Sequence, residues 1–290
     1  MKHIINAVVV LLIASSCKYN NAVAQSTSEA LKPPIATFIT ETLGLTHCES
    51  AVYNAKNTII YASLIGKSED GDGSIATINL EGKLINAKFI SDLNDPKGIA
   101  ITEDRLYVSD ITELVEADLM TGQIIKKHSI EGIQFLNDVA IDSAGNVFVS
   151  DTRTSKIYQL DTKGNFSLWL ADEDLDNPNG LLVQNKTMYV ASWGSQPNGG
   201  RVSKIDMTTK SIDTVTTIIG NLDGIRPYDK DRLIISDWRS GNIHLVDDKG
   251  NTQQILQVGQ SVGDIAYIPE KKLLLLPMNK QSRLLFYRLE

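Results

Sequence analysis

Short apolar runs recur along most of the chain at a nearly constant interval. A polar residue and a small residue open an apolar stretch, and a turn then leads to a second apolar run. The opening stretch occurs six times, at spacings of 48, 40, 42, 44 and 40 residues. The polar or small residues that open it are Glu49, Lys97, Asn137, Asn179, Asp223 and Gly263. Apolar runs this short, bounded by Gly, Asn and Asp, indicate β-strands.

Further runs follow each opening stretch with the same period. The clearest second runs cover residues 106–110, 147–151 and 233–237, and turn signals then lead to third and fourth runs. Four short strands in every 40-odd residues are typical of one blade of a β-propeller. The six copies therefore predict an all-β, six-bladed β-propeller.

The last copy lacks a fourth strand. Its predicted strands cover residues 262–268, 272–277 and 283–289, whereas residues 35–43 form a spare apolar run before the first complete copy. We expect this N-terminal strand to join the last blade and close the ring, which would protect an open sheet edge. The propeller would then occupy residues 35–290, and the polar segment 25–34 would be a tether.

Composition and charge restrict the partners. The chain has 290 residues, of which 42% are hydrophobic and 22% charged, so a sizeable core is possible and intrinsic disorder is excluded. Lys and Arg number 28 against 35 Asp and Glu, which gives a net charge of −7. Since no basic cluster interrupts this acidic chain, we expect a small-molecule substrate and no nucleic-acid partner.

The first residues have the features of an export signal. A positive start precedes the apolar run 4–14, which is too short to span a bilayer and is typical of a secretory signal peptide. Cleavage before Gln25 would give a signal peptide over residues 1–24. A lipobox ending at Cys17 would instead give residues 1–16 and a lipid on that cysteine. We expect an exported bacterial protein, either periplasmic or an outer-membrane lipoprotein, that meets a membrane only through this possible lipid.

Only Cys17 and Cys48 are present, so the mature chain is expected to have no intrachain disulfide. For Cys48, a role as a small buried side chain is favoured over that of a catalytic thiol.

The residues that open the blades carry the candidate chemistry. In a propeller the start of each innermost strand faces the central channel, so Glu49, Asn137, Asn179 and Asp223 would converge. Two carboxylates and two amides, without His or Cys, form a set of hard ligands that suits Ca²⁺ better than Zn²⁺. A simpler interpretation is that Asn and Asp open these strands because they form turns, but this explains Glu49 poorly.

The motifs Glu49-Ser-Ala-Val-Tyr, Asn137-Asp-Val-Ala-Ile-Asp, Asn179-Gly-Leu and Asp223-Gly-Ile resemble the metal-site motifs of the senescence marker protein/gluconolactonase family. That family consists of six-bladed, calcium-dependent lactonases, and the resemblance covers roughly residues 46–290. It implies that Glu49, Asn179 and Asp223 bind the metal and that Asn137, beside it, helps to hold water or substrate. It also implies that Asp223 is the general base. We therefore assign these four residues to the predicted metal site.

One position departs from that family. Gluconolactonases carry a sugar-contacting Arg two residues before the Asn that matches Asn137, and this chain has Phe135 there, so an aldonolactone is not the expected substrate. Substrate binding would instead involve Lys97, Phe135, Asn137 and Trp193. Trp193 could border the pocket or pack between blades.

The leading hypothesis is an exported, Ca²⁺-dependent hydrolase of the lactonase type that opens a lactone or a related ester. The alternatives are a non-catalytic NHL-like propeller that binds a sugar, peptide or protein around a structural ion, and an isomerase or lyase on the same scaffold. His47 is either a proton shuttle or, as we favour, a structural residue.

Overall fold

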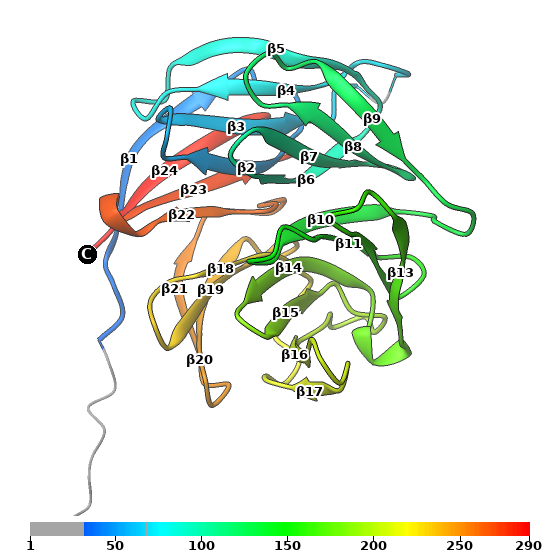
Figure 1. Cartoon of the computed structure of the whole chain (residues 1–290). Helices are drawn as coiled ribbons and strands as arrows, with labels where there is room; N and C mark the ends of the chain where they lie inside the picture. Colours follow the sequence, from blue (N-terminus) through cyan, green and yellow to red (C-terminus); the bar gives the residue numbers. More distant parts are fainter. Residues whose placement is uncertain (1–31, 68) are drawn as a thin grey trace, which may run out of the picture. The chain divides into compact units, whose positions relative to one another are not determined.

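Six four-stranded antiparallel sheets make up the structure (Figure 1). The computed structural model describes residues 32–67 and 69–290, and residues Pro33–Glu290 form one unit. The first strand of each blade lies against the first strands of its neighbours around the ring. The sheets are therefore blades of a propeller, and the predicted all-β, six-bladed fold is confirmed. Within the described residues the helical segments are two 3-10 turns, η1 (Glu173–Leu175) and η2 (Pro269–Lys271).

Each of the first five blades consists of four consecutive strands, from the innermost to the outermost. In chain order these are β2 (Cys48–Asn54), β3 (Ile59–Leu64), β4 (Gly73–Ile78) and β5 (Leu84–Leu93); β6 (Pro96–Ile101), β7 (Arg105–Asp110), β8 (Glu113–Asp118) and β9 (Ile124–His128); β10 (Leu136–Ile141), β11 (Val147–Asp151), β12 (Lys156–Leu160) and β13 (Phe166–Ala171); β14 (Pro178–Gln184), β15 (Thr187–Ser192), β16 (Val202–Asp206) and β17 (Ile212–Thr214); β18 (Leu222–Pro227), β19 (Arg232–Asp237), β20 (Asn242–Asp247) and β21 (Thr252–Gln257).

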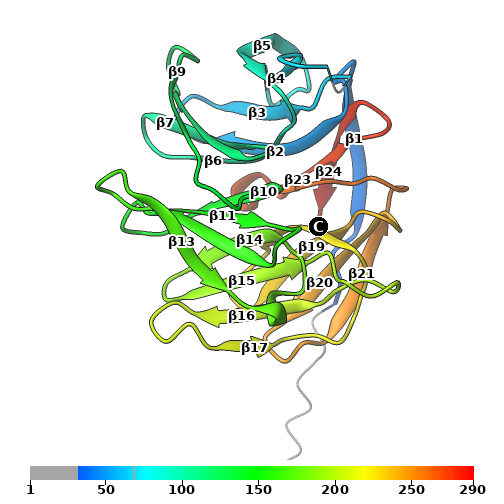
Figure 2. The ribbon, with the colours of Figure 1, turned by 90° about the vertical axis from the view of Figure 1, so that its right-hand side faces the viewer.

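The last blade takes its outer strand from the N-terminal side, as predicted. Its strands are β22 (Ala266–Ile268), β23 (Leu273–Met278), β24 (Arg283–Leu289) and β1 (Ala36–Leu43). β1 pairs antiparallel with β24 along its length, and an ion pair of 3.0 Å joins Glu41 to Arg283. The two strands lie side by side in both views (Figures 1 and 2).

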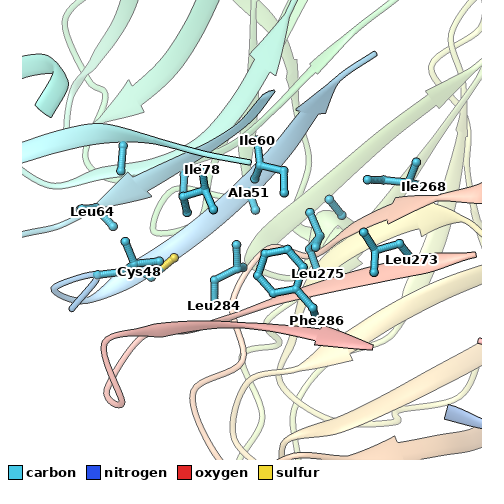
Figure 3. Close-up of a cluster of buried hydrophobic side chains, with 14 residues drawn as sticks. Cys48, Ala51, Ile60, Leu64, Ile78, Ile268, Leu273, Leu275, Leu284 and Phe286 are labelled. Atoms are coloured by element: carbon cyan, nitrogen blue, oxygen red, sulfur yellow. The ribbon is translucent and has the colours of Figure 1, made fainter. Parts of the chain in front are cut away.

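Six hydrophobic clusters hold the ring together, one between each pair of neighbouring blades. Figure 3 shows the cluster between the first and last blades, where Cys48 and Ile60 pack with Leu275 and Phe286. Cys48 is fully buried, as expected for a small apolar side chain, and burial raises the pKa of its thiol. Because the apolar side chains lie between blades, the centre of the ring is left to polar groups.

The innermost strand of the last blade is shorter than the predicted span of residues 262–268. The residues before β22 bond to the neighbouring blade instead. The amide of Asp264 donates to the carbonyl of Glu49 (2.8 Å), and the amide of Ala51 donates to the carbonyl of Asp264 (3.2 Å). A Cβ at Gly263 would lie 2.1 Å from the Glu49 carbonyl oxygen, so only glycine fits this close approach.

The predicted signal peptide, the possible lipidation site at Cys17 and most of the tether over residues 25–34 lie outside the described residues. In the part of the chain that is described, no helix is long and apolar enough to cross a membrane.

Candidate functional site

A pocket of about 550 Å³ is built around the starts of the innermost strands. The seven residues assigned to the site from the sequence all line it: Glu49, Lys97, Phe135, Asn137, Asn179, Trp193 and Asp223. The propeller therefore brings together side chains that are up to 174 residues apart in sequence, counted from Glu49 to Asp223. Their roles in metal and substrate binding remain predictions.

A β-bulge accompanies each of the five blade-opening site residues. In β14 the pairing with the next strand shifts register around Asn179, and in β18 it shifts around Asp223. The corresponding shifts in β2, β6 and β10 contain Glu49, Lys97 and Asn137. A bulge bends its strand and changes the direction of a side chain. These irregularities therefore direct side chains of five blades to one pocket.

We call Glu49, Asn137, Asn179 and Asp223 the upper tier of the channel. The side-chain amide of Asn179 donates to the carbonyl of Leu222 (3.1 Å), which leaves its Oδ1 for the pocket. Among the described residues, neither this buried oxygen nor Oε2 of Glu49 has a hydrogen-bond partner. Orphaned buried oxygens are costly and require an explanation, such as an ion.

The ionised forms of the two upper-tier carboxyl groups are unfavourable in their surroundings. Burial raises the pKa of Glu49 to about 7, although the charge of Lys97 opposes this shift. Burial and then the charge of Glu49 raise the pKa of Asp223 well above its ordinary value. Two buried acids that repel each other are stable as anions only when a cation or proton intervenes.

Lys97 supplies a positive charge to the pocket but is already paired. Its ammonium donates to Asp95 at 2.6 Å and lies 4.9 Å from the centre of the Phe135 ring. The Lys97 side chain is 7% exposed and that of Asp95 is 29% exposed, so the ammonium is shielded from water while its partner is not. Because Asp95 neutralises Lys97, most of the charge of Glu49 and Asp223 remains uncompensated.

The upper tier fits a hard divalent cation. Carboxylate and amide oxygens are the ligands that Ca²⁺ prefers, and the orphaned oxygens of Glu49 and Asn179 would gain a partner. Across residues 32–67 and 69–290, no three His, Cys, Asp or Glu side chains are close enough to hold a metal. A site here would therefore depend on the Asn oxygens as well as on Glu49 and Asp223.

A second charged layer, missed in the sequence analysis, combines the residue after the blade-opening position in three blades with an arginine three residues after Asp223. We call Ser50, Asp138, Asp264 and Arg226 the lower tier. The Arg226 guanidinium donates to Asp264 at 2.6 Å and lies 3.6 Å from Asp138. The Ser50 hydroxyl donates to Asp264 at 2.7 Å. Burial raises the pKa of both aspartates, most strongly that of Asp264, while Arg226 opposes the shift.

Glycine occupies the matching lower-tier position in the other three blades. A Cβ at Gly98, Gly180 or Gly224 would lie 2.5 Å or less from the backbone of the next blade. The channel is therefore too narrow for six side chains at this level. These glycines are visible in the sequence, but there they indicate only turns.

Aromatic and polar groups complete the pocket wall. The rings of Trp193 and Trp238 lie 5.7 Å apart, inclined at 60°, and both border the pocket. Trp193 therefore both lines the pocket and packs against its neighbour. His47 is also part of the wall, as are Arg153 and Asn279, which the sequence analysis did not assign to the site.

Comparisons with known proteins show the fold. No family model matches the chain, and no curated protein sequence matches it. Among solved structures, a gluconolactonase from Xanthomonas campestris is similar, with 15% identity and a TM-score of 0.68 over 90% of this chain and 96% of that chain. A streptogramin B lyase is similar at 10% identity and a TM-score of 0.65, over 91% of this chain and 100% of the other. A virginiamycin B lyase from Staphylococcus aureus is similar at 11% identity and a TM-score of 0.65, over 89% and 100%.

Proposed function

We propose that this chain is an exported, divalent-metal-dependent hydrolase, most suited to Ca²⁺, that opens a lactone or a related ester. One observation carries the proposal: two buried, uncompensated carboxyl groups and an orphaned amide oxygen meet at a pocket of about 550 Å³. That volume is in the range of small-molecule sites. The gluconolactonase of 15% identity shows that a lactonase can be built on this fold.

Glu49, Asn179 and Asp223 would hold the cation, with Asn137 beside it. When bound, the cation would polarise the ester carbonyl and stabilise the charge that develops on its oxygen. The Asn137 side chain is oriented by a hydrogen bond to the Thr152 hydroxyl (3.3 Å), so it is positioned to hold the attacking water.

Asp223 would take a proton from that water as the oxygen attacks the carbonyl carbon. The ester C–O bond then breaks, and the proton passes from Asp223 to the departing alkoxide, which gives an alcohol and a carboxylic acid. In the metal-free chain burial raises the pKa of Asp223, and this would oppose the lowering that a bound cation causes.

A second candidate is ring opening by elimination. His47 lines the same pocket and offers a base other than Asp223, and two lyases share the fold. Elimination would yield an unsaturated acid of unchanged mass, whereas hydrolysis adds one water. Mass spectrometry of the product separates the two reactions.

The test is proton release by the mature chain, residues 25–290, with a panel of lactones and aryl esters. It would be run with Ca²⁺, with chelator, and with Asp223→Asn; Asp213→Asn, at an exposed position of β17, is the matched control. We expect turnover that needs the metal, disappears in Asp223→Asn and persists in the control.

No turnover of any compound, together with stabilisation by Ca²⁺, would contradict the hydrolase and favour a binding propeller with a structural ion. Turnover that is indifferent to both chelator and Asp223→Asn would contradict the assignment of the site.

A further inference from the structure

We propose that Arg153, stacked on Phe135, forms an anion subsite in the pocket, and that the substrate carries a carboxylate in addition to the ester that is cleaved. This inference rests on the proposed function of the same pocket, and it narrows the substrate to acidic lactones or esters.

The arginine is held in place by its surroundings. Its Cζ lies 4.6 Å from the centre of the Phe135 ring, a distance at which a guanidinium is attracted to an aromatic face. The backbone amides of both residues donate to the carboxylate of Asp151, each at 3.2 Å. One buried carboxylate therefore fixes the two segments that present the guanidinium and its aromatic support.

The charge balance of the pocket leaves this guanidinium unused. Five charged residues line the pocket, and Lys97 is paired with Asp95. A divalent cation would compensate Glu49 and Asp223. Among residues 32–67 and 69–290, no carboxylate pairs with the Arg153 side chain, which is exposed at the pocket wall. The metal-loaded pocket would therefore carry one spare positive charge.

A carboxylate matches that charge better than a phosphate does. A guanidinium presents paired N–H donors that fit the two oxygens of a carboxylate. A phosphate monoester carries nearly two negative charges at neutral pH and would be repelled more strongly by the acids in the same pocket. The single spare charge of the pocket thus favours a monoanionic group.

Lys97, the other cation that contacts the Phe135 ring, does not compete for this role. Lys97 is buried and bonded to Asp95 at 2.6 Å, so a substrate carboxylate would have to displace an existing partner. Arg153 needs no such exchange. Phe135 is thus contacted by one paired cation, Lys97, and by one available cation, Arg153.

The experiment compares three lactones that share one ring and differ in one substituent: a carboxylate, the corresponding primary amide, and a phosphate monoester. The wild-type chain, Arg153→Gln, Arg153→Lys and Arg288→Gln are assayed with Ca²⁺. Arg288 is an exposed residue of β24 and serves as the control for loss of a positive charge.

We expect wild type to prefer the carboxylate over the amide about tenfold in kcat/KM, as one charge-assisted contact predicts. Arg153→Gln should lose this preference through KM with little change in kcat, Arg153→Lys should keep part of it, and Arg288→Gln should keep all of it. Arg288→Gln should have the same activity as wild type on both the carboxylate and the amide.

Equal turnover of carboxylate and amide by wild type, or a preference that survives Arg153→Gln, would overturn the subsite and leave the hydrolase standing. A preference for the phosphate would overturn the choice of carboxylate. If no lactone is turned over, the subsite is tested by calorimetry instead. The binding of the ring-opened dicarboxylate and of its monoamide is then measured for wild type and for Arg153→Gln. Tighter binding of the dicarboxylate that depends on Arg153 supports the subsite even then, and equal binding rejects it.

Discussion

The two tiers of the channel hold the same number of carboxylates in different states. The upper tier contains Glu49 and Asp223, with the nearby lysine already bonded to Asp95. The lower tier contains Asp138 and Asp264, bridged by the guanidinium of Arg226. All four acids are nearly inaccessible to solvent, so burial alone does not distinguish the tiers.

The difference lies in compensation. Asp264 accepts from Arg226 and from the Ser50 hydroxyl, and Asp138 accepts from the amide of Leu181 at 2.7 Å. Among the described residues, Oδ1 of Asp264 has no hydrogen-bond partner, as is true of Oε2 of Glu49 and Oδ1 of Asn179, but only the lower-tier carboxylates are bridged by a guanidinium. Among the described residues, a buried cation therefore bridges the carboxylates only at the lower level, because the buried lysine near the upper tier is paired with Asp95. A pair of buried carboxyl groups without a bridging cation, beside a similar pair with one, is expected where selection for function rather than for stability has determined the residues.

The largest expected effect concerns Asp223→Asn. Loss of a positioned base lowers a reaction rate by about 10²- to 10⁴-fold, and we expect kcat to fall by that factor. The same change removes an uncompensated buried charge, so the metal-free protein should become more stable. Stopped-assay kinetics and thermal melting in chelator measure the two effects. A variant that is both inactive and less stable in chelator would show that Asp223 is a structural residue.

The next largest effect concerns Arg226→Met, which removes the only cation of the lower tier. Breaking a buried ion pair from one side costs about 3–5 kcal/mol, because charges are left without a partner. We expect a loss of stability of that size in urea denaturation. Lys97→Met, its counterpart near the upper tier, should cost less because it leaves Asp95 partly exposed to water. Equal losses of stability in Arg226→Met and Lys97→Met would contradict the proposed difference between the tiers.

The pH dependence of the metal-free protein should report on the upper tier. The pKa of Glu49 is raised to about 7 in the folded state, so this state binds a proton more tightly than the unfolded chain does. Stability should therefore fall as pH rises from about 4.5 through 7, on the order of 1–3 kcal/mol. Added Ca²⁺ should reverse the trend. Thermal melting at constant ionic strength gives the curve, and Glu49→Gln should flatten it; an unchanged slope in that variant would place the titration elsewhere.

The smallest effect should come from Ser50→Ala. It removes one donor to Asp264 but leaves the contact with Arg226, so we expect a loss of about 1 kcal/mol. Activity and calcium affinity should be unchanged. Urea denaturation measures the stability of the variant, and the lactone assay measures its activity. A loss of activity would show that the two tiers function as one unit.

The sequence was sufficient to predict the propeller and seven of the residues that line its pocket. The 40-residue period predicted the blades, and residues 35–43 predicted the closing strand, since an edge left open would have been unprotected. Glu49, Asn179 and Asp223 were found because equivalent positions of repeated units converge in a ring. Because the units repeat, equivalent positions in the sequence predict equivalent positions in space, and no information on side-chain contacts is needed.

The bulges, the partners of two arginines and the length of β22 depend on three-dimensional contacts that the sequence does not reveal. The bulges at the blade-opening residues have no sequence signature beyond the glycines that also form turns. Arg226 stands where the other blades carry apolar residues, and Arg153 is matched by Arg239 of the fifth blade, but the repeat could not predict the partners of either arginine. The shortened β22 resulted from Gly263 approaching the first blade, a contact between residues more than 200 positions apart.

Calorimetric titration of Ca²⁺ into the metal-free protein tests the central claim most directly. We predict one ion per wild-type chain, the same affinity in the lower-tier variant Ser50→Ala, and at least a hundredfold weaker binding in Glu49→Gln and Asp223→Asn. Binding that is unchanged in both upper-tier variants, or absent from the wild type, would contradict the assignment of a cation to the upper tier.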